Sequence, residues 1–291
     1  MPFLECLVHT LAEIDLSIPG YATEMIDRLA QIKGTGEAQY ESLLQILAEV
    51  YVMQGVVAVA DRNDAGRALV THEPGLRGQK NPECEALIAG RWCALEVKTP
   101  KLIEHGRLRA INPWQVTARL PSETTKEFQK TLPRDNPVKD FLVSANAKFV
   151  AYEAYRGDAL RILVIIWDDF CNEPITALIS PVSGLLTPKS FYRDALGNAV
   201  TYPNIDGIIV IRHQHQIIHS TRNEPLVDNV TDAMKYRHDQ FPPKAFIPIP
   251  MGRVIPEEVL NALNAVPCSE LMGAEYQPGE LIMWINGEKS N

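Results

Sequence analysis

The sequence lacks a cysteine framework, a long apolar run and an excess of basic residues, and each absence narrows its class. Its five cysteines are scattered and form no Cys-x-x-Cys pair, so we expect neither a disulfide framework nor a zinc site. No apolar run approaches the ~20 residues of a membrane helix. The N-terminus, beginning Met1-Pro2-Phe3, shows no basic segment ahead of a hydrophobic stretch. We therefore expect a cytoplasmic protein with no membrane partner.

The net charge of −8 argues against a protein that coats nucleic acid nonspecifically, because such affinity comes mostly from Lys and Arg on phosphates. A local basic stripe would still suffice for docking. Residues 100–136 are too long for a bare connection in a compact domain, so we predict a functional insertion there. It contains Trp114 and Phe128, and its basic residues are Lys101, His105, Arg107, Arg109, Arg119, Lys126, Lys130 and Arg134. Substrate contact and a dimer contact or solvated loop both remain open.

A hairpin in the first third of the chain predicts a pair of facing carboxylates. If Ala89-Gly90 forms a two-residue turn, the strand register places Glu83 opposite Glu96. If the turn shifts by one residue, Glu85 opposes Glu96 instead. Glycine at the second turn position favours the first register. Glu83 is therefore the preferred partner of Glu96, with Glu85 as the alternative.

Lys98 follows Glu96 by two residues, so both side chains project from the same face of the strand. Two carboxylates and one amine would then gather at one end of a sheet. Carboxylate oxygens can hold a hard divalent cation, and the lysine could orient a water or stabilise charge during phosphodiester cleavage. The alternative is that these charges are simply solvated at a strand end.

Pro82-Glu83, the hairpin and Glu96-Val97-Lys98 resemble the signature of the PD-(D/E)XK nuclease superfamily, which has the restriction-endonuclease-like fold. That family usually has Asp after the proline, where this chain has Glu83. The resemblance implies an α/β fold whose core order is helix, three strands, helix, two strands, with a mixed sheet flanked by helices. It also implies a helix glutamate near the metal, for which Glu41 is the first candidate and Glu49 the second.

The surrounding sequence follows that order over roughly residues 36 to 212. A helix begins near Gly36 and ends at Gln54-Gly55, and apolar residues then predict a first strand over 56–60. Downstream, Pro137 at a favoured first position predicts a second helix to Val150. Apolar runs predict two further strands over 160–167 and 207–211.

The expected domain organisation has three parts. Residues 1–35 form an N-terminal helical lead with helices over 3–14 and 21–32, and residues 36–224 form the nuclease-like domain. Residues 225–291 form a proline-punctuated C-terminal appendage, with a helix over 256–264 and a strand over 280–285.

Two other clusters are judged less informative. His213 and His215 alternate after the last strand and could ligate zinc, but we expect both to be solvated. Asp168-Asp169 is interpreted as an ordinary pair of strand-end carboxylates.

The leading hypothesis is an Mg²⁺-dependent (endo)deoxyribonuclease-like hydrolase, with Mn²⁺ as a substitute ion and DNA as the expected partner. The predicted metal ligands are Glu41, Glu83, Glu85 and Glu96, and Glu83, Glu96 and Lys98 are the predicted catalytic residues. The alternative is a nuclease-like fold that does not cut and binds nucleic acid or a protein partner. An unrelated α/β domain and a homodimer also remain open.

Overall fold

The computed structural model describes residues 3–75, 80–103, 107, 114–116, 135–169, 171–236, 243–279 and 281–283, of which 114–116, 135–136 and 281–283 are described by their backbone alone. The chain divides into two compact units. Unit 1 comprises Met1–Thr99, Leu142–Asp169 and Tyr202–Leu271, and unit 2 comprises Pro100–Phe141, Phe170–Thr201 and Met272–Asn291. The sequence boundaries expected near residues 35 and 224 stay a prediction.

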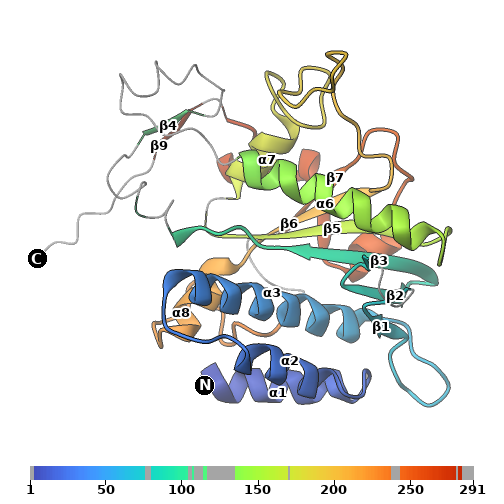
Figure 1. Cartoon of the computed structure of the whole chain (residues 1–291), viewed down its shortest axis with the longest axis vertical. Coiled ribbons are helices and arrows are strands. Elements are labelled where there is room, and N and C mark those ends of the chain that lie inside the picture. Colours follow the sequence, from blue (N-terminus) through green and yellow to red (C-terminus); the bar gives the residue numbers. More distant parts are fainter. Residues whose placement is uncertain are drawn as a thin grey trace, which may run out of the picture. The chain divides into compact units, whose positions relative to one another are not determined.

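Unit 1 is built on a mixed seven-stranded sheet in the order β1-β2-β3-β5-β6-β7-β8 (Figure 1). β3 runs parallel to β5, and β5 parallel to β6, whereas β1-β2, β2-β3 and β6-β7 are antiparallel and β7-β8 is parallel. The strands are β1 (Val70–His72), β2 (Cys84–Ile88), β3 (Arg91–Lys98), β5 (Leu160–Trp167), β6 (Gly207–Arg212), β7 (Lys244–Pro248) and β8 (Ala265–Pro267).

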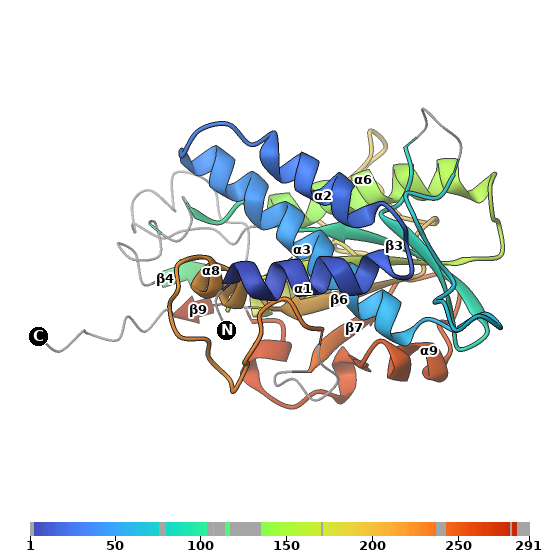
Figure 2. The same ribbon diagram turned by 90° about the horizontal axis from the view of Figure 1, so that it is seen from below.

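Helices cover both faces of this sheet. α3 and α8 lie against one face with α1 and α2 outside α3, and α6 lies over the opposite face (Figures 1 and 2). The helices of this layer structure are α1 (Phe3–Asp15), α2 (Tyr21–Ala30), α3 (Glu37–Val59), α6 (Asp135–Glu153), α8 (Gln214–Thr221) and α9 (Glu257–Ala262). The expected α/β class with a mixed sheet flanked by helices is therefore confirmed.

Most elements expected from apolar periodicity are present. The two N-terminal helices, the helix after Pro137, the strand at 160–167 and the strand that starts at Gly207 all occur within a few residues of their expected bounds. The segment expected to be an appendage also contributes strands β7 and β8 to the sheet.

The first strand was assigned to the wrong segment. Residues 56–60, expected to form it, continue helix α3 to Val59, and β1 lies instead at Val70–His72. Gly55 does not end the helix: a Cβ there would lie 2.3 Å from the ring of Tyr236, so glycine permits a close approach. A β-branched run favours a strand only by propensity, and burial of the helix against the sheet overrides it.

α3 is long and apolar enough to cross a membrane by length and composition alone. In the folded protein, 67% of its most apolar window is buried, as in the core helix of a globular protein. It packs on the sheet face that presents Cys84, Ala86, Leu95 and Val97.

The β2-β3 hairpin forms as expected. Ile88 pairs with Arg91, and both turn residues have positive φ, 48° at Ala89 and 71° at Gly90. These angles are those of a type I′ turn, whose twist suits a two-residue hairpin. The N–H of Gly90 also donates to Asp61 Oδ2 at 2.7 Å.

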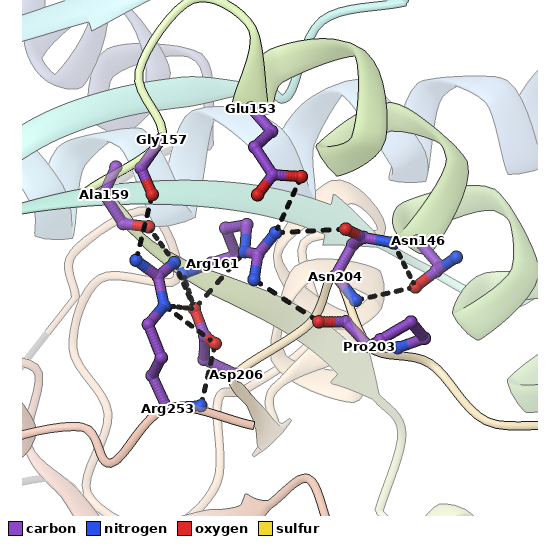
Figure 3. A network of polar contacts seen from close by, with 9 residues as sticks. All are labelled: Asn146, Glu153, Gly157, Ala159, Arg161, Pro203, Asn204, Asp206 and Arg253. Carbon is purple, nitrogen blue, oxygen red and sulfur yellow. Dashed lines mark hydrogen bonds and ion pairs between the residues drawn. The ribbon is translucent and has the colours of Figure 1, made fainter. Parts of the chain in front are cut away.

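A network of ion pairs and hydrogen bonds lies where β5 and β6 begin in unit 1 (Figure 3). The Asp206 carboxylate accepts the backbone N–H of Arg161 at 2.8 Å and Arg253 Nη2 at 2.7 Å. Burial opposes ionisation of Asp206, but hydrogen bonds from Arg253 and from the backbone outweigh it and lower its pKa. The network joins the loop at Arg253 to the sheet and leaves Asp206 without spare acceptor capacity.

Unit 2 contains helix α7 (Asn172–Ile179) and a two-stranded ribbon of β4 (Trp114–Val116) and β9 (Leu281–Met283). Beside α7, the N–H of Gly279 donates to Thr176 Oγ1 at 3.0 Å. The short 3₁₀ helices are Cys268–Glu270 in unit 1 and Ala274–Tyr276 in unit 2. Most of the predicted insertion at 100–136 lies outside the described residues.

Candidate functional site

The end of strand β3 carries a buried carboxylate and an amine in direct contact. Glu96 is 1% exposed, and Lys98 Nζ lies 2.8 Å from Glu96 Oε1. The two side chains share a strand face because they are two residues apart. An ionised carboxylate is tolerated at such depth only when cations or hydrogen bonds compensate it. Two of the residues predicted to be catalytic are thus brought together.

A second amine reaches the same carboxylate from helix α6. Lys148 Nζ lies 2.8 Å from Glu96 Oε1 and 2.9 Å from Oε2. Lys148 is not among the site residues predicted from the sequence, although helical periodicity indicates its position. Lys148 lies three residues after Ala145 and four before Tyr152, both buried, so helical periodicity places it on the sheet-facing side of α6.

Helix α3 contributes Glu49, which is 4% exposed. Its Oε2 accepts a hydrogen bond from Arg28 Nη2 at 2.5 Å. Burial and then the negative charge of Glu83 raise the pKa of Glu49 from 4.5 to about 7, with Glu96 adding to the rise and Arg28 opposing it. The charges of Glu83 and, less strongly, Glu96 therefore act on Glu49 inside the protein.

Glu83 comes directly before β2, and extending the Cys84–Leu95 pairing by one residue places it opposite Glu96. Its Oε1 is buried and accepts no hydrogen bond among the described residues. The imidazole of His72 faces Glu83, with Nε2 3.4 Å from that oxygen. The register that favoured Glu83 over Glu85 is confirmed.

The other two predicted ligands lie elsewhere. Glu85 accepts hydrogen bonds from the Tyr152 hydroxyl on α6 and, at 2.8 Å, from Arg156 Nε just after that helix, so it already has partners. Burial raises the pKa of Glu85 although Arg156 opposes the rise. Glu41 precedes Glu49 by two helical turns, about 12 Å along the axis of α3. Of the two helix candidates, Glu49 is the one near Glu83 and Glu96.

Glu49, Glu83 and Glu96 are buried acids that a hard divalent cation could compensate, although their ligand atoms do not all lie within 4.8 Å of one another. Burial, and then the charges of Glu83 and Glu96, raise the pKa of Glu49, and Glu83 Oε1 makes no hydrogen bond among the described residues, with His72 Nε2 3.4 Å away. A cation bound by carboxylate oxygens would relieve both conditions. The donor set is all oxygen, which Mg²⁺ and Mn²⁺ accept.

The histidine cluster after β6 is not the solvated pair expected from the sequence. Helix α8 begins at Gln214, so strand alternation does not apply, and His213 is buried, stacked on Tyr51 with ring centroids 3.8 Å apart. Burial lowers the pKa of His213 to about 3. His215 is also mostly buried, and burial lowers its pKa to about 4. These histidines serve as neutral core groups.

The remaining sequence candidates divide into two groups. Asp169 pairs with Arg212 at the ends of β5 and β6, and Asp168 is buried beside it. Of the basic residues predicted to contact substrate, Lys101 and Arg107 are described, and the others lie outside the described residues.

Comparison with protein-family models finds no match, and comparisons with curated proteins and with solved structures likewise find none. The chemistry of this site is therefore argued from the chain's own residues.

Proposed function

We propose that the chain is a divalent-cation-dependent nuclease that hydrolyses phosphodiester bonds in DNA. The observation that carries the proposal is the contact of the buried Glu96 carboxylate with Lys98, whose Nζ lies 2.8 Å away, beside two further buried acids, Glu83 and Glu49, with the charge of Glu83 acting on Glu49. Buried acids near like charges are unfavourable for stability alone. Their cost is explained if they hold a cation that the reaction requires.

The element order supports the same proposal. Helix α3, the strands β1, β2 and β3, helix α6 and strand β5 follow one another as in the core of the PD-(D/E)XK nucleases. The strands lie side by side as β1-β2-β3-β5, with the last pair parallel. The carboxylates lie where β2 begins and β3 ends.

Each residue has a definite role in this proposal. Glu49, Glu83 and Glu96 would hold Mg²⁺ or Mn²⁺, which supplies electrophilic activation of the phosphate and of water when bound. The Lys98 ammonium stabilises negative charge that develops on the phosphate oxygens, or orients the attacking water. Lys148 fixes the orientation of Glu96 through contacts with both of its oxygens.

A second candidate is a nuclease-like module that binds nucleic acid or a protein without cutting. Lys148 favours it, because its amine lies within hydrogen-bonding distance of both Glu96 oxygens, the atoms that a cation would need. The Glu at position 83, where the PD-(D/E)XK signature usually has Asp, also favours it.

Cleavage of supercoiled plasmid in Mg²⁺ or Mn²⁺ separates the two candidates. The wild type should nick the plasmid, and Lys98→Ala should be slower by about 10²-fold or more, the usual loss on removing one preorganised electrostatic group. Lys33→Ala, which removes an exposed lysine of unit 1, is the matched control and should cut like the wild type. Equal cleavage by Lys98→Ala would refute the assigned role, and no cleavage by the wild type would favour the binding module.

The helix glutamate is tested in the same assay. Glu49→Gln should abolish cation-dependent cleavage, whereas Glu41→Gln, two turns away on α3, should retain it. The reverse ranking would restore Glu41 as the ligand and remove Glu49.

A further inference from the structure

A mixed cluster of carboxylates and a histidine lies beside Glu83 and outside the proposed catalytic set. Glu24 on α2, His72 on β1 and Glu73 place one ligand atom each within 4.8 Å of one another. His72 Nδ1 is 3.3 Å from Glu24 Oε2. The two glutamates are exposed and free to adjust, whereas the His72 side chain is only 7% exposed.

The buried atoms around this cluster are only loosely paired. Among the described residues, the Tyr21 hydroxyl, His72 Nε2 and Glu83 Oε1 make no hydrogen bond, although the last two face each other at 3.4 Å. The edge of the Tyr21 ring meets the His72 ring, with centroids 5.0 Å apart and an interplanar angle of 87°, which fixes the imidazole orientation. The 3.4 Å separation is longer than an ordinary hydrogen bond, and an ion on Nδ1 that fixes the proton on Nε2 would let this buried pair form one.

We propose that Glu24, His72 and Glu73 bind a second divalent cation, of the transition-metal class represented by Mn²⁺ and Zn²⁺. The imidazole has the arrangement typical of a metal ligand: Nδ1 faces the Glu24 carboxylate, and Nε2 faces a carboxylate oxygen of Glu83 at 3.4 Å. Ligating histidines commonly donate the opposite N–H to a carboxylate in this way. An imidazole nitrogen favours these ions over Mg²⁺, which prefers oxygen.

The second cation would act on the first site through Glu83. When Nδ1 of His72 ligates the ion, Nε2 carries the proton and can donate to Glu83 Oε1, which otherwise lacks a donor. The hydrogen bond would hold that carboxylate in one orientation toward Glu49. Glu83 is thus the link between the two sites, but the second site needs neither Glu96 nor Lys98.

The test is a titration of the full chain with Mn²⁺, once without Mg²⁺ and once in a large excess of Mg²⁺. Electron paramagnetic resonance measures the free Mn²⁺ in both titrations. In excess Mg²⁺ the wild type should retain one bound Mn²⁺, because Mg²⁺ competes poorly for a site with a nitrogen ligand. Glu24→Gln and His72→Phe should weaken this binding at least about tenfold, the lower limit seen even for outer partners of metal ligands.

Matched controls come from another histidine–glutamate pair. His9 and Glu13 form an exposed pair on α1, 3.0 Å apart, and His9→Phe and Glu13→Gln should bind Mn²⁺ like the wild type. Glu24 is exposed, so Glu24→Gln decides the question even if His72→Phe does not fold. Complete displacement of Mn²⁺ by Mg²⁺, or unchanged binding by Glu24→Gln, would overturn the second site.

The two proposals fail separately. Glu96→Gln should abolish DNA cleavage yet keep the Mg²⁺-resistant Mn²⁺ site. If the wild type cuts no DNA but binds Mn²⁺, and the Glu24→Gln variant loses that binding, the nuclease proposal is wrong and the second cation site stands.

Discussion

Replacing Glu49 by Gln removes a buried carboxylate that the charge of Glu83 repels and should change how stability depends on pH. The pKa of Glu49 is raised from 4.5 to about 7, first by burial and then by Glu83. Because the folded-state pKa exceeds the unfolded-state value, this group stabilises the fold fully below about pH 4.5. That contribution is lost as the pH rises through about 7.

The magnitude follows from the same two pKa values. One pKa unit corresponds to about 1.4 kcal/mol, so the environment disfavours ionised Glu49 by about 3 kcal/mol over the whole transition. Between about pH 5 and about pH 8 the expected loss is about 2 kcal/mol, because part of the titration lies below that interval. Gln cannot titrate, so the variant should lack this component.

The assay is urea unfolding of the wild type and Glu49→Gln in EDTA at both pH values, followed by circular dichroism. All other groups titrate in both proteins, so the difference between their free energies of unfolding isolates Glu49. That difference should move by about 2 kcal/mol in favour of the variant at the higher pH. A cation at 100 times its dissociation constant should then stabilise the wild type by about 2.7 kcal/mol.

The reasoning would be refuted by parallel pH profiles of the two proteins in EDTA. Such a result would mean that neither burial nor the charge of Glu83 disfavours ionised Glu49. A stabilisation by Mg²⁺ that is equal in wild type and variant would remove Glu49 from the cation site.

Three further predictions concern other groups. Asp206→Asn should lower the free energy of unfolding by about 3 kcal/mol, since it leaves buried guanidinium groups uncompensated, while Mn²⁺ binding stays unchanged; an unaltered urea midpoint would contradict this. His213, whose pKa burial lowers to about 3, contributes stability that is complete above about pH 6.5 and is lost as the pH falls toward 3. Relative to His213→Gln, the free energy of unfolding of the wild type should fall by about 3 kcal/mol between about pH 6.5 and about pH 4. Equal pH dependence of the two free energies would disprove a buried neutral imidazole. Lys148→Met should raise Mg²⁺ affinity about tenfold in calorimetry, because it removes a charged partner from the Glu96 oxygens; weaker binding would show that the amine supports the site.

The hairpin and its register depend on residues that are close together in the sequence. A two-residue turn ending in glycine restricts the backbone to positive φ at both positions, and this fixes which residues face each other. Glu83 and Glu96 could therefore be placed opposite each other, and Glu96 and Lys98 on one face, from chain order alone. The buried strands at 160–167 and 207–212 are equally local, because their apolar runs leave no solvated face.

The choice between Glu41 and Glu49 needed the tertiary structure. Both are on the same helix, and sequence periodicity does not say which turn of the helix packs beside the hairpin. That position is set by contacts such as Gly55 against Tyr236, which are 181 residues apart in the chain. Because the sequence predicted that the helix ends at Gly55, it also predicted the first strand at 56–60, whereas that strand lies at Val70–His72.

The sequence by itself determined the hairpin, the α/β class and one face of the site, since these depend on residues near one another along the chain. Only the tertiary structure decided which distant groups complete that site. Arg28 reaches Glu49 from α2, His72 reaches Glu83 from β1, and Lys148 reaches Glu96 from α6. The physical reason is that burial and charge compensation act in space, and sequence distance carries no information about them.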